Sequence, residues 1–193
     1  MVDHGMGNLR SVAKALEAAG ADVVVTADAG AIERGDALCV PGQGIFGRCM
    51  AALSETALGD VVRGWIESER PFLGICLGMQ ILFDTSEEAG STPGLGVMNG
   101  RVVRLPDTVT VPHIGWNTLV SSDSEEGEAA VHYYFDHSYG VIPDDDSVVA
   151  GWCHHGSRFA AMVRSGPILA VQFHPEKSGG AGIALLERWV HAA

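Results

Sequence analysis

The order of short apolar runs and helical patterns in the first half of the chain most constrains the fold. Residues 37–40 and 71–75 are short apolar runs that lead into glycine turns, a pattern typical of buried strands in a parallel sheet. Apolar residues recur at helical spacing in residues 8–19 and 58–66. A β-branched run at residues 22–26 predicts one more strand. Alternating strands and helices predict the α/β class, with a central, mostly parallel sheet flanked by helices.

The second half of the chain predicts an antiparallel extension of that sheet. Five β-like runs alternate there with proline, glycine and acidic loops: residues 101–105, 130–135, 148–153, 159–163 and 168–173. Helical spacing returns in residues 180–191, and the acidic runs at residues 123–128 and 144–146 are expected to be solvated loops. The 193 residues contain no repeat and no linker-like stretch, so one domain spanning residues 1–193 is expected.

The charge balance and the apolar segments exclude several classes of protein. Twelve basic residues against 24 acidic ones leave a net charge of -12, so the electrostatic footprint of a nucleic-acid binder is missing. The longest apolar stretch, residues 71–83, is shorter than the roughly 20 residues that span a bilayer, and the first residues lack the pattern of a signal peptide. Four cysteines without a CxxC pair are typical of a reducing compartment. We therefore expect a cytoplasmic protein with no nucleic-acid or membrane partner.

Residues 74–78, Gly-Ile-Cys-Leu-Gly, have the pattern of a nucleophile elbow with cysteine at its centre. Glycines two residues before and two residues after the nucleophile let a strained turn close against its neighbours. Such a turn holds the sulfur at the N-terminus of a helix, where the helix dipole favours the thiolate. The pentapeptide alone fits two interpretations of Cys76 equally well, a nucleophile or a buried core cysteine.

A thiolate that attacks an acyl carbon needs a general acid for the departing nitrogen, and histidine is the usual provider. His174 follows an apolar run, so it is expected at the carboxyl edge of the sheet. Glu176 is suitably spaced to accept the other ring N–H and to fix the tautomer. His154 and His155 are expected to be exposed, and His132 alternates within a strand, so none of these three is predicted to be catalytic.

An acyl-transfer intermediate carries an oxyanion, which needs backbone N–H donors held by a permissive turn. Gly42 and Gln43 lie in a Pro-Gly-Gln-Gly turn after a buried run and can present such donors, and the amide of Leu77 is the second donor in an elbow. Residues 5–10 superficially resemble a dinucleotide-binding loop, but Arg10 stands where its third glycine should be. We therefore predict no nicotinamide cofactor, no other cofactor and no metal.

Five motifs in order along the chain carry a family resemblance. Residues 74–80 and 172–178 resemble the two signatures of class I, triad-type glutamine amidotransferases, whose fold is α/β and flavodoxin-like. Together with residues 3–11, 112–117 and 135–139, they are similar to the branch of that family formed by the glutaminase subunits of imidazole glycerol phosphate synthases, which serve histidine biosynthesis.

The resemblance implies a heterodimer with a cyclase subunit, a (β/α)8 barrel that receives ammonia released from glutamine through a γ-glutamyl thioester. It makes Cys76 the nucleophile, His174 its acid-base partner and Glu176 the orienting carboxylate. The glutamine pocket is expected to be shaped by Gly44, Gln80, His137, Ser138 and Tyr139. The docking face toward the cyclase is expected to include Asn8, Trp116, Asn117 and Lys177.

Three positions depart from the family pattern. Only Met1 and Val2 precede Asp3, so the first strand is expected to be short, with an effect on stability and not on catalysis. His4 replaces an expected tyrosine, and Gln43 replaces an aliphatic residue in the oxyanion turn, close to the chemistry. Two alternatives remain: a triad glutaminase of anthranilate, aminodeoxychorismate or pyridoxal phosphate synthesis, and a flavodoxin-like regulatory module whose cysteine is structural.

Overall fold

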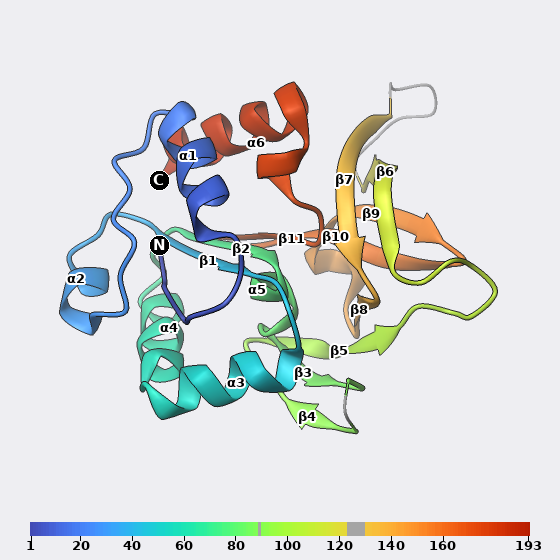
Figure 1. Ribbon diagram of the computed structural model, residues 1–193, viewed down its shortest axis with the longest axis horizontal. Coiled ribbons are helices and arrows are strands. Elements are labelled where there is room, and N and C mark those ends of the chain that lie inside the picture. The colour runs from blue at the N-terminus through green and yellow to red at the C-terminus, as the bar shows by residue number, and fades with distance from the viewer. Residues whose placement is uncertain (89, 123–129) are drawn as a thin grey trace.

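A single curled sheet of eleven strands organises the computed structural model, which describes residues 1–88, 90–122 and 130–193 (Figure 1). The strands are β1 (Leu38–Gly42), β2 (Phe72–Cys76), β3 (Phe83–Ser86), β4 (Thr92–Pro93), β5 (Met98–Arg104), β6 (His113–Ser121), β7 (Val131–His137), β8 (Tyr139–Pro143), β9 (Val149–His155), β10 (Ser157–Ser165) and β11 (Ile168–Val171). The helices are α1 (Leu9–Ala18), α2 (Ala29–Glu33), α3 (Phe46–Glu55), α4 (Leu58–Glu67), α5 (Leu77–Gln80) and α6 (Gly179–Ala192), with short 3₁₀ turns at η1 (Asp146–Val148) and η2 (Pro175–Lys177).

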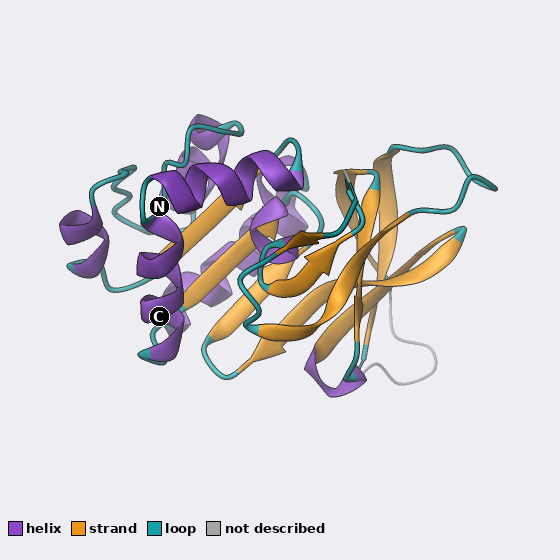
Figure 2. Ribbon diagram, turned by 90° about the horizontal axis from the view of Figure 1, so that it is seen from below, coloured by secondary structure: helices purple, strands orange, loops and turns teal. Residues whose placement is uncertain are grey.

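The centre of the sheet is parallel and its extension is antiparallel. Strands β1, β2 and β11 pair in parallel, and β10 then pairs antiparallel with both β11 and β8. Helices surround the parallel part, while the antiparallel strands reach beyond them (Figure 2). The predicted α/β class, with a parallel centre, flanking helices and an antiparallel extension, is confirmed.

Alternation along the central strands creates two apolar layers. In β1, Leu38 and Val40 pack into one layer with α3 and α4, whereas Cys39 faces the other. Leu73 and Ile75 of β2 join the second layer, which contains the apolar side chains of α1 and α6. Since successive side chains of a strand point to opposite faces, a short run that is apolar throughout is buried on both sides. The same periodicity explains why the central strands could be predicted.

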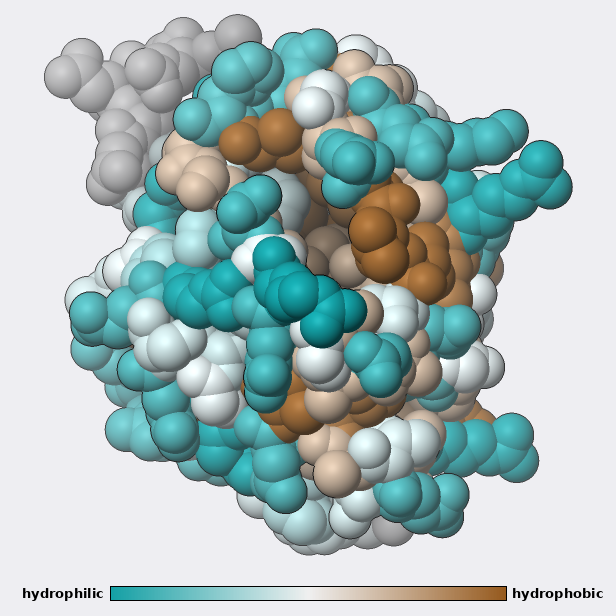
Figure 3. Space-filling model, turned by 90° about the vertical axis from the view of Figure 1, so that its left-hand side faces the viewer, coloured by the Kyte–Doolittle hydropathy of each residue, from teal (hydrophilic) through white to brown (hydrophobic). Residues whose placement is uncertain are grey.

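The run at residues 22–26 is not the strand that its β-branched residues predict. It makes one isolated parallel bridge, between Thr26 and Val2, while Val24 and Val25 are exposed. The amide of Val2 donates to the carbonyl of Cys39 at 2.9 Å, so Val2 lies between this run and β1. The expected short first strand is thus a single bridge. Figure 3 shows apolar side chains among hydrophilic ones on this side of the molecule, where α2 also lies.

The hydrophobic pattern of β6 explains why it is not predicted from the sequence. Its apolar residues Ile114, Trp116 and Val120 are on the exposed face, while His113 is on the buried face. In the usual half-buried strand, apolar side chains are on the buried face and polar ones on the exposed face, so the arrangement in β6 is reversed. The helices α2 and α3 and the strands β3, β4 and β8 are also absent from the prediction, whereas the ends of α1, α4 and α6 lie within one residue of the predicted helices.

Two further observations complete the fold. The acidic run at residues 144–146 is exposed, as expected, and the run at residues 123–128 lies outside the described residues. Among the helices of residues 1–88, 90–122 and 130–193, none combines the length and apolar character needed to cross a membrane.

Candidate active site

Cys76 is the last residue of β2 and lies on a tight turn that leads directly into α5. Its φ of 53° is in the left-handed region, which non-glycine residues adopt only under constraint. A Cβ atom at Gly74 would lie 2.6 Å from the carbonyl oxygen of Gly78, and one at Gly78 would overlap the carbonyl oxygen of Val40. Both glycines of the pentapeptide therefore allow contacts that any side chain would prevent.

His174 and Glu176 form a buried pair just after β11. The Nδ1–H of His174 donates to Oε1 of Glu176 at 2.8 Å, and each side chain is 2% exposed. Burial lowers the pKa of His174, but hydrogen bonding to Cys76 and Glu176 and their negative charges outweigh it and raise the pKa above its usual range. Within the described residues, Nε2 of His174 has no hydrogen bond of good geometry. That nitrogen is therefore available to exchange a proton at the sulfur.

Tyr134 and Ser178, neither of which is predicted as a site residue, hold this segment in place. The backbone N–H of His174 donates to the carbonyl of Tyr134 at 2.8 Å. The hydroxyl of Ser178 donates to the carbonyl of His174 at 2.6 Å and accepts from the amide of Tyr134 at 2.9 Å. Strand β7 thus fixes the backbone on both sides of the 3₁₀ turn that carries Glu176. The signal that the sequence offers for Ser178 is its place at the end of the 172–178 signature, whereas Tyr134 lies just outside the 135–139 motif.

The Pro-Gly-Gln-Gly turn follows β1 directly beside the elbow. Gly42 is the register partner of Cys76, and a Cβ atom at Gly42 would lie 2.7 Å from Cβ of Leu77. Gly44 has a φ of 116°, which only glycine adopts without strain. Glycine at both positions therefore lets Gln43 lie next to the nucleophile.

A hollow of about 390 Å³ opens above the elbow and brings together eight residues that the sequence predicts. They are Gln43, Gly44, Cys76, Leu77, Gln80, His137, Ser138 and Tyr139. Three further lining residues are not predicted: Glu88, Pro112 and Asp136. Glu88 also caps α3, since its Oε2 accepts from the amide of Phe46 at 2.6 Å. The sequence gives no motif around Glu88 that would have distinguished it from a surface acid.

Two glutamine side chains connect the hollow to the sulfur. Nε2 of Gln80 donates to Oε1 of Gln172 and to the carbonyl of Tyr139, both at 3.0 Å. Nε2 of Gln172 lies 3.5 Å from Sγ of Cys76. Gln172 is fully buried, so these amides hold one another and the nucleophile in a fixed arrangement.

The four residues expected at a docking face do not all point outward. Trp116 is 57% exposed, and its ring meets that of Tyr134 edge-on at 6.2 Å. Lys177 lies 5.6 Å from the ring centre of Tyr134 and pairs with Asp136 at 3.2 Å. Trp116 and Lys177 therefore share one surface.

The two asparagines of that set have partners within the chain. The side chain of Asn8 caps α1 by accepting from the amide of Ser11 at 3.3 Å. Nδ2 of Asn117 donates to Nε2 of His113 at 3.1 Å. His155, expected to be exposed, is half-buried and stacks on His113 with ring centres 4.0 Å apart. That expectation is wrong because β6 and β9 pair and bring the two rings together.

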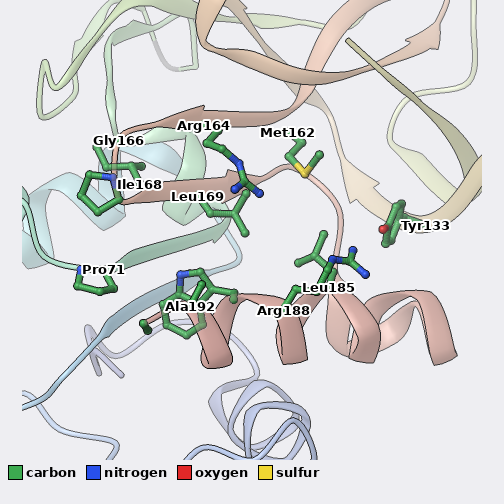
Figure 4. Close-up of a pocket in the computed structure, with 13 residues that line it drawn as sticks. Pro71, Tyr133, Met162, Arg164, Gly166, Ile168, Leu169, Leu185, Arg188 and Ala192 are labelled. Carbon is green, nitrogen blue, oxygen red and sulfur yellow. The ribbon is translucent and has the colours of Figure 1, made fainter. Parts of the chain in front are cut away.

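A second hollow, of about 350 Å³, lies between α6 and the strands β10 and β11 (Figure 4). Arg164 and Arg188 line it, together with mostly apolar residues that include Ile168 at the start of β11. The elbow lies at the opposite, carboxyl end of the neighbouring strand β2. Because this hollow contains neither a cysteine nor a histidine, we place the chemistry in the hollow above Cys76.

The other three cysteines are unsuited to nucleophilic chemistry. Burial raises the pKa of Cys39, Cys49 and Cys153 to about 12, so these groups stay protonated near neutral pH and are weak nucleophiles. Each belongs to an apolar layer or lies at its border. Among the four cysteines only Cys76 lies at an elbow beside a histidine–carboxylate pair.

Comparison with protein families agrees with this geometry. A family model described as glutamine amidotransferase class-I matches residues 1–193. The chain belongs to this family. Its elbow and its buried histidine–carboxylate pair are therefore features of a class I glutamine amidotransferase.

Curated relatives narrow the position of this class I glutamine amidotransferase within the family. The chain is 45% identical to imidazole glycerol phosphate synthase subunit HisH of Rhodopirellula baltica, over 100% of this chain and 96% of that protein. It is 47% identical to the HisH subunit of Aquifex aeolicus with the same coverage. The chloroplastic imidazole glycerol phosphate synthase hisHF of Arabidopsis thaliana is 43% identical over 99% of this chain, which covers 33% of that longer protein.

Solved structures share the fold of this glutamine amidotransferase at lower identity. One described as a glutamine amidotransferase superposes with a TM-score of 0.78 and 23% identity, covering 100% of this chain and 98% of that one. PurLQS from Thermotoga maritima superposes with a TM-score of 0.69 and 19% identity, covering 99% and 95%. At these identities, the likeness supports the fold alone.

Proposed function

We propose that this chain is the glutaminase subunit of an imidazole glycerol phosphate synthase. It hydrolyses glutamine to glutamate and ammonia, and the ammonia passes to a cyclase subunit that makes imidazole glycerol phosphate and aminoimidazole carboxamide ribonucleotide. The observation that carries the glutaminase activity is the position of Cys76 on a strained elbow beside the buried His174–Glu176 pair. The names of full-length relatives at 45–47% identity support the choice of synthase.

In the first half of the reaction, the thiolate of Cys76 attacks the γ-carbonyl carbon of glutamine. The oxyanion that forms is stabilised by the amide of Leu77 and by the turn at Gly42 and Gln43, which lies beside it. His174 donates the Nε2 proton to the departing nitrogen, and the C–N bond breaks to leave ammonia and a γ-glutamyl thioester.

In the second half, water attacks the thioester carbon while Nε2 of His174 accepts a proton from it. The C–S bond breaks, glutamate leaves and the Cys76 sulfur is regenerated. The carboxylate of Glu176 accepts from the Nδ1–H of His174 and so keeps Nε2 toward the sulfur in both halves. The two buried residues therefore act as a proton carrier and its orienting carboxylate.

Glutamine recognition is assigned to the hollow above the elbow. Gly44, Gln80, His137, Ser138 and Tyr139 line it and are proposed to contact the substrate. Glu88 lines the same hollow, and its carboxylate is suited to the α-ammonium group of glutamine. This charge pair would distinguish the amino acid from simple amides.

We propose that the partner is a (β/α)8 cyclase that docks on the outer face of β6 and β7 and forms a heterodimer. Ile114 and Trp116 are more than half exposed on this face. The ring of Tyr134 contacts the ring of Trp116, and Lys177 lies beside the same Tyr134 ring. An exposed apolar patch with an aromatic anchor is typical of a protein interface. Asn8 completes the proposed face, whereas the side chain of Asn117 bonds to His113 on the other side of β6 and is not assigned to it. The four free cysteines support a cytoplasmic location.

Covalent labelling of the full chain tests the glutaminase assignment. The glutamine analogue 6-diazo-5-oxonorleucine should alkylate Cys76 with loss of N₂, and peptide mapping by mass spectrometry should find the adduct on that cysteine alone. Cys76→Ser should abolish labelling, whereas Cys49→Ala, at a buried cysteine in α3, should leave it intact. A chain that is folded yet resists labelling, as a regulatory module would, contradicts the proposal. A glutaminase of another pathway would be labelled but would not support synthesis of imidazole glycerol phosphate with the cyclase.

A further inference from the structure

Two buried histidines meet across the β6–β7 pair, and the function proposed above assigns a place only to His137, at the wall of the hollow. His113 and His137 are register partners in these neighbouring strands (Figure 1). Nδ1 of His113 lies 3.0 Å from Nε2 of His137, and the residues are only 5% and 6% exposed. The ring of His113 lies between Phe135, with which it stacks at 4.9 Å, and His155 on the other side.

The protonation of His137 follows from its partners. Its Nδ1 lies 2.8 Å from the carbonyl oxygen of Tyr139, which can only accept, so Nδ1 carries a proton. Burial lowers the pKa of His137 to about 3, so the imidazole is neutral near pH 7. A neutral imidazole has one donor and one acceptor nitrogen. Nε2 of His137 is therefore an acceptor, and Nδ1 of His113 must donate to it.

The same reasoning extends to Asn117. Burial lowers the pKa of His113 to about 4, so His113 is neutral with its proton on Nδ1, and its Nε2 accepts from Nδ2 of Asn117 at 3.1 Å. The amide orientation of Asn117 has independent support. Nδ2 also donates to the carbonyl of His154 at 3.2 Å, and Oδ1 accepts from the amide of Thr118 at 2.7 Å. Every donor in this hydrogen-bond network meets an acceptor.

The other end of this hydrogen-bond network reaches the nucleophile. The Tyr139 carbonyl that accepts from His137 also accepts from Nε2 of Gln80 at 3.0 Å. Gln80 in turn donates to Gln172, whose own amide nitrogen lies 3.5 Å from Sγ of Cys76. A continuous path of side chains and one carbonyl thus joins the strand β6 to the elbow.

We propose that His113 is a positioning residue for the glutaminase. The His113–His137 pair, protonated at Nδ1 on both rings, holds the carbonyl of Tyr139. Through that carbonyl the pair holds the amides of Gln80 and Gln172 around the substrate and Cys76. This inference rests on the proposed function for its catalytic consequence, while the tautomers themselves do not depend on it. If Nε2 of His137 lost its donor, a buried acceptor would be left unpaired. Gln80 would then no longer be held in its place at the wall of the hollow.

Nuclear magnetic resonance on the full chain labelled with ¹⁵N-histidine tests the tautomers directly. At pH 7, one-bond N–H correlations of His113 and His137 should place the proton on Nδ1 in both rings, and a coupling across the N–H···N bond should join Nδ1 of His113 to Nε2 of His137. A free histidine favours the proton on Nε2, so the expected pattern does not arise by default. A proton on Nε2 of either ring, or a doubly protonated ring, overturns the proposal.

Variants of His113 test the consequence for catalysis. His113→Phe keeps an aromatic ring between Phe135 and His155 but removes the donor, and it should raise KM for glutamine by about tenfold. His113→Asn offers an amide donor near the former Nδ1 and should restore much of that loss. His132→Phe, on an exposed residue of the paired strand β7, is the matched control and should keep the wild-type KM.

The outcomes separate this inference from the proposed function. A loss of folded protein alone would lower kcat at constant KM, so the rise in KM reports positioning and not damage to the fold. If the wild type is active and His113→Phe has the same KM for glutamine, the inference is overturned, while the glutaminase assignment stands. A wild-type complex with the cyclase that does not hydrolyse glutamine would contradict the proposed function, and the NMR result would still decide the tautomers.

Discussion

Gly78 lies so close to the carbonyl oxygen of Val40 that no Cβ atom fits between them. The contact joins the first turn of α5 to the neighbouring strand β1, and it lets the elbow close under Cys76. We expect Gly78→Ala to lower the free energy of unfolding by about 3 kcal/mol, the upper end of the usual cost of overpacking. Urea denaturation of both proteins measures this difference.

Gly64→Ala is the control for Gly78→Ala. Gly64 lies inside α4, and a Cβ atom there would meet nothing within 4 Å. Replacing a helical glycine at an open position should raise stability by about 0.5–1 kcal/mol. Equal effects of the two substitutions would show that the elbow does not depend on the contact with Val40.

The buried pair beside the sulfur gives a prediction about catalytic roles. His174→Ala should lower glutamine-dependent turnover by roughly 100- to 10,000-fold, the usual contribution of a general acid–base, and Glu176→Gln should lower it less because an orienting group does not carry the proton. Synthesis by the complex from added ammonium should be spared in both variants, since added ammonium reaches the cyclase without glutamine hydrolysis, the only step in which the two residues act. Comparable loss of the ammonium-dependent rate would contradict these roles.

Glu88 gives a prediction about substrate recognition. Glu88→Gln keeps an oxygen acceptor for the amide of Phe46 but removes the charge proposed to face the α-ammonium group. KM for glutamine should rise by about tenfold or more, with kcat changed much less. Glu87→Gln, at the exposed neighbouring carboxylate, serves as the control and should behave as wild type. A Glu88→Gln variant with unchanged KM would remove Glu88 from the site.

Trp116 gives a prediction about the partner. Trp116→Ala should weaken binding of the cyclase by about 30-fold or more, since a central aromatic anchor typically contributes at least about 2 kcal/mol. Val24→Ala changes another exposed apolar side chain, 61% accessible and on the run at residues 22–26, and should bind as wild type. Isothermal titration calorimetry with the purified cyclase measures both. Equal affinities would locate the docking face elsewhere.

The buried imidazoles predict how stability depends on pH. Burial lowers the folded-state pKa of His113 to about 4 and of His137 to about 3, below the value of about 6.5 in an unfolded chain. The unfolded state therefore binds more protons below pH 6.5, and stability falls as pH decreases toward 4. Each histidine should contribute a loss on the order of 1 kcal/mol per pH unit.

Urea midpoints between pH 7 and pH 5 measure that slope. His174, whose folded pKa is raised, is protonated in both states below pH 6.5 and adds little to it. The slope should become shallower in His113→Phe and stay the same in His132→Phe. A wild-type stability that rises on acidification over this range would contradict the buried, neutral state of the pair.

Much of the catalytic geometry could be predicted because it depends on local sequence. Residues 72–80 contain the strand, the glycine-flanked turn and the helix of the elbow, and Gly74 is required because a Cβ atom there would lie too close to the carbonyl of Gly78 in the same segment. His174 and Glu176 are two residues apart, so their contact is also a local matter. The central strands were predictable because a run that is apolar on both faces must be buried on both.

Contacts between residues distant in the sequence were decided by the tertiary structure alone. Glu88 reaches the hollow only because it caps α3, 42 residues earlier in the chain, and His113 meets His137 only through the register of β6 and β7. The apolar outer face of β6 reverses the pattern from which strands are predicted. Periodicity reports which residues share a face of an element, whereas the partner of each face depends on how the elements pack. For this protein, the sequence determined the nucleophile and its proton carrier, and packing determined what surrounds and positions them.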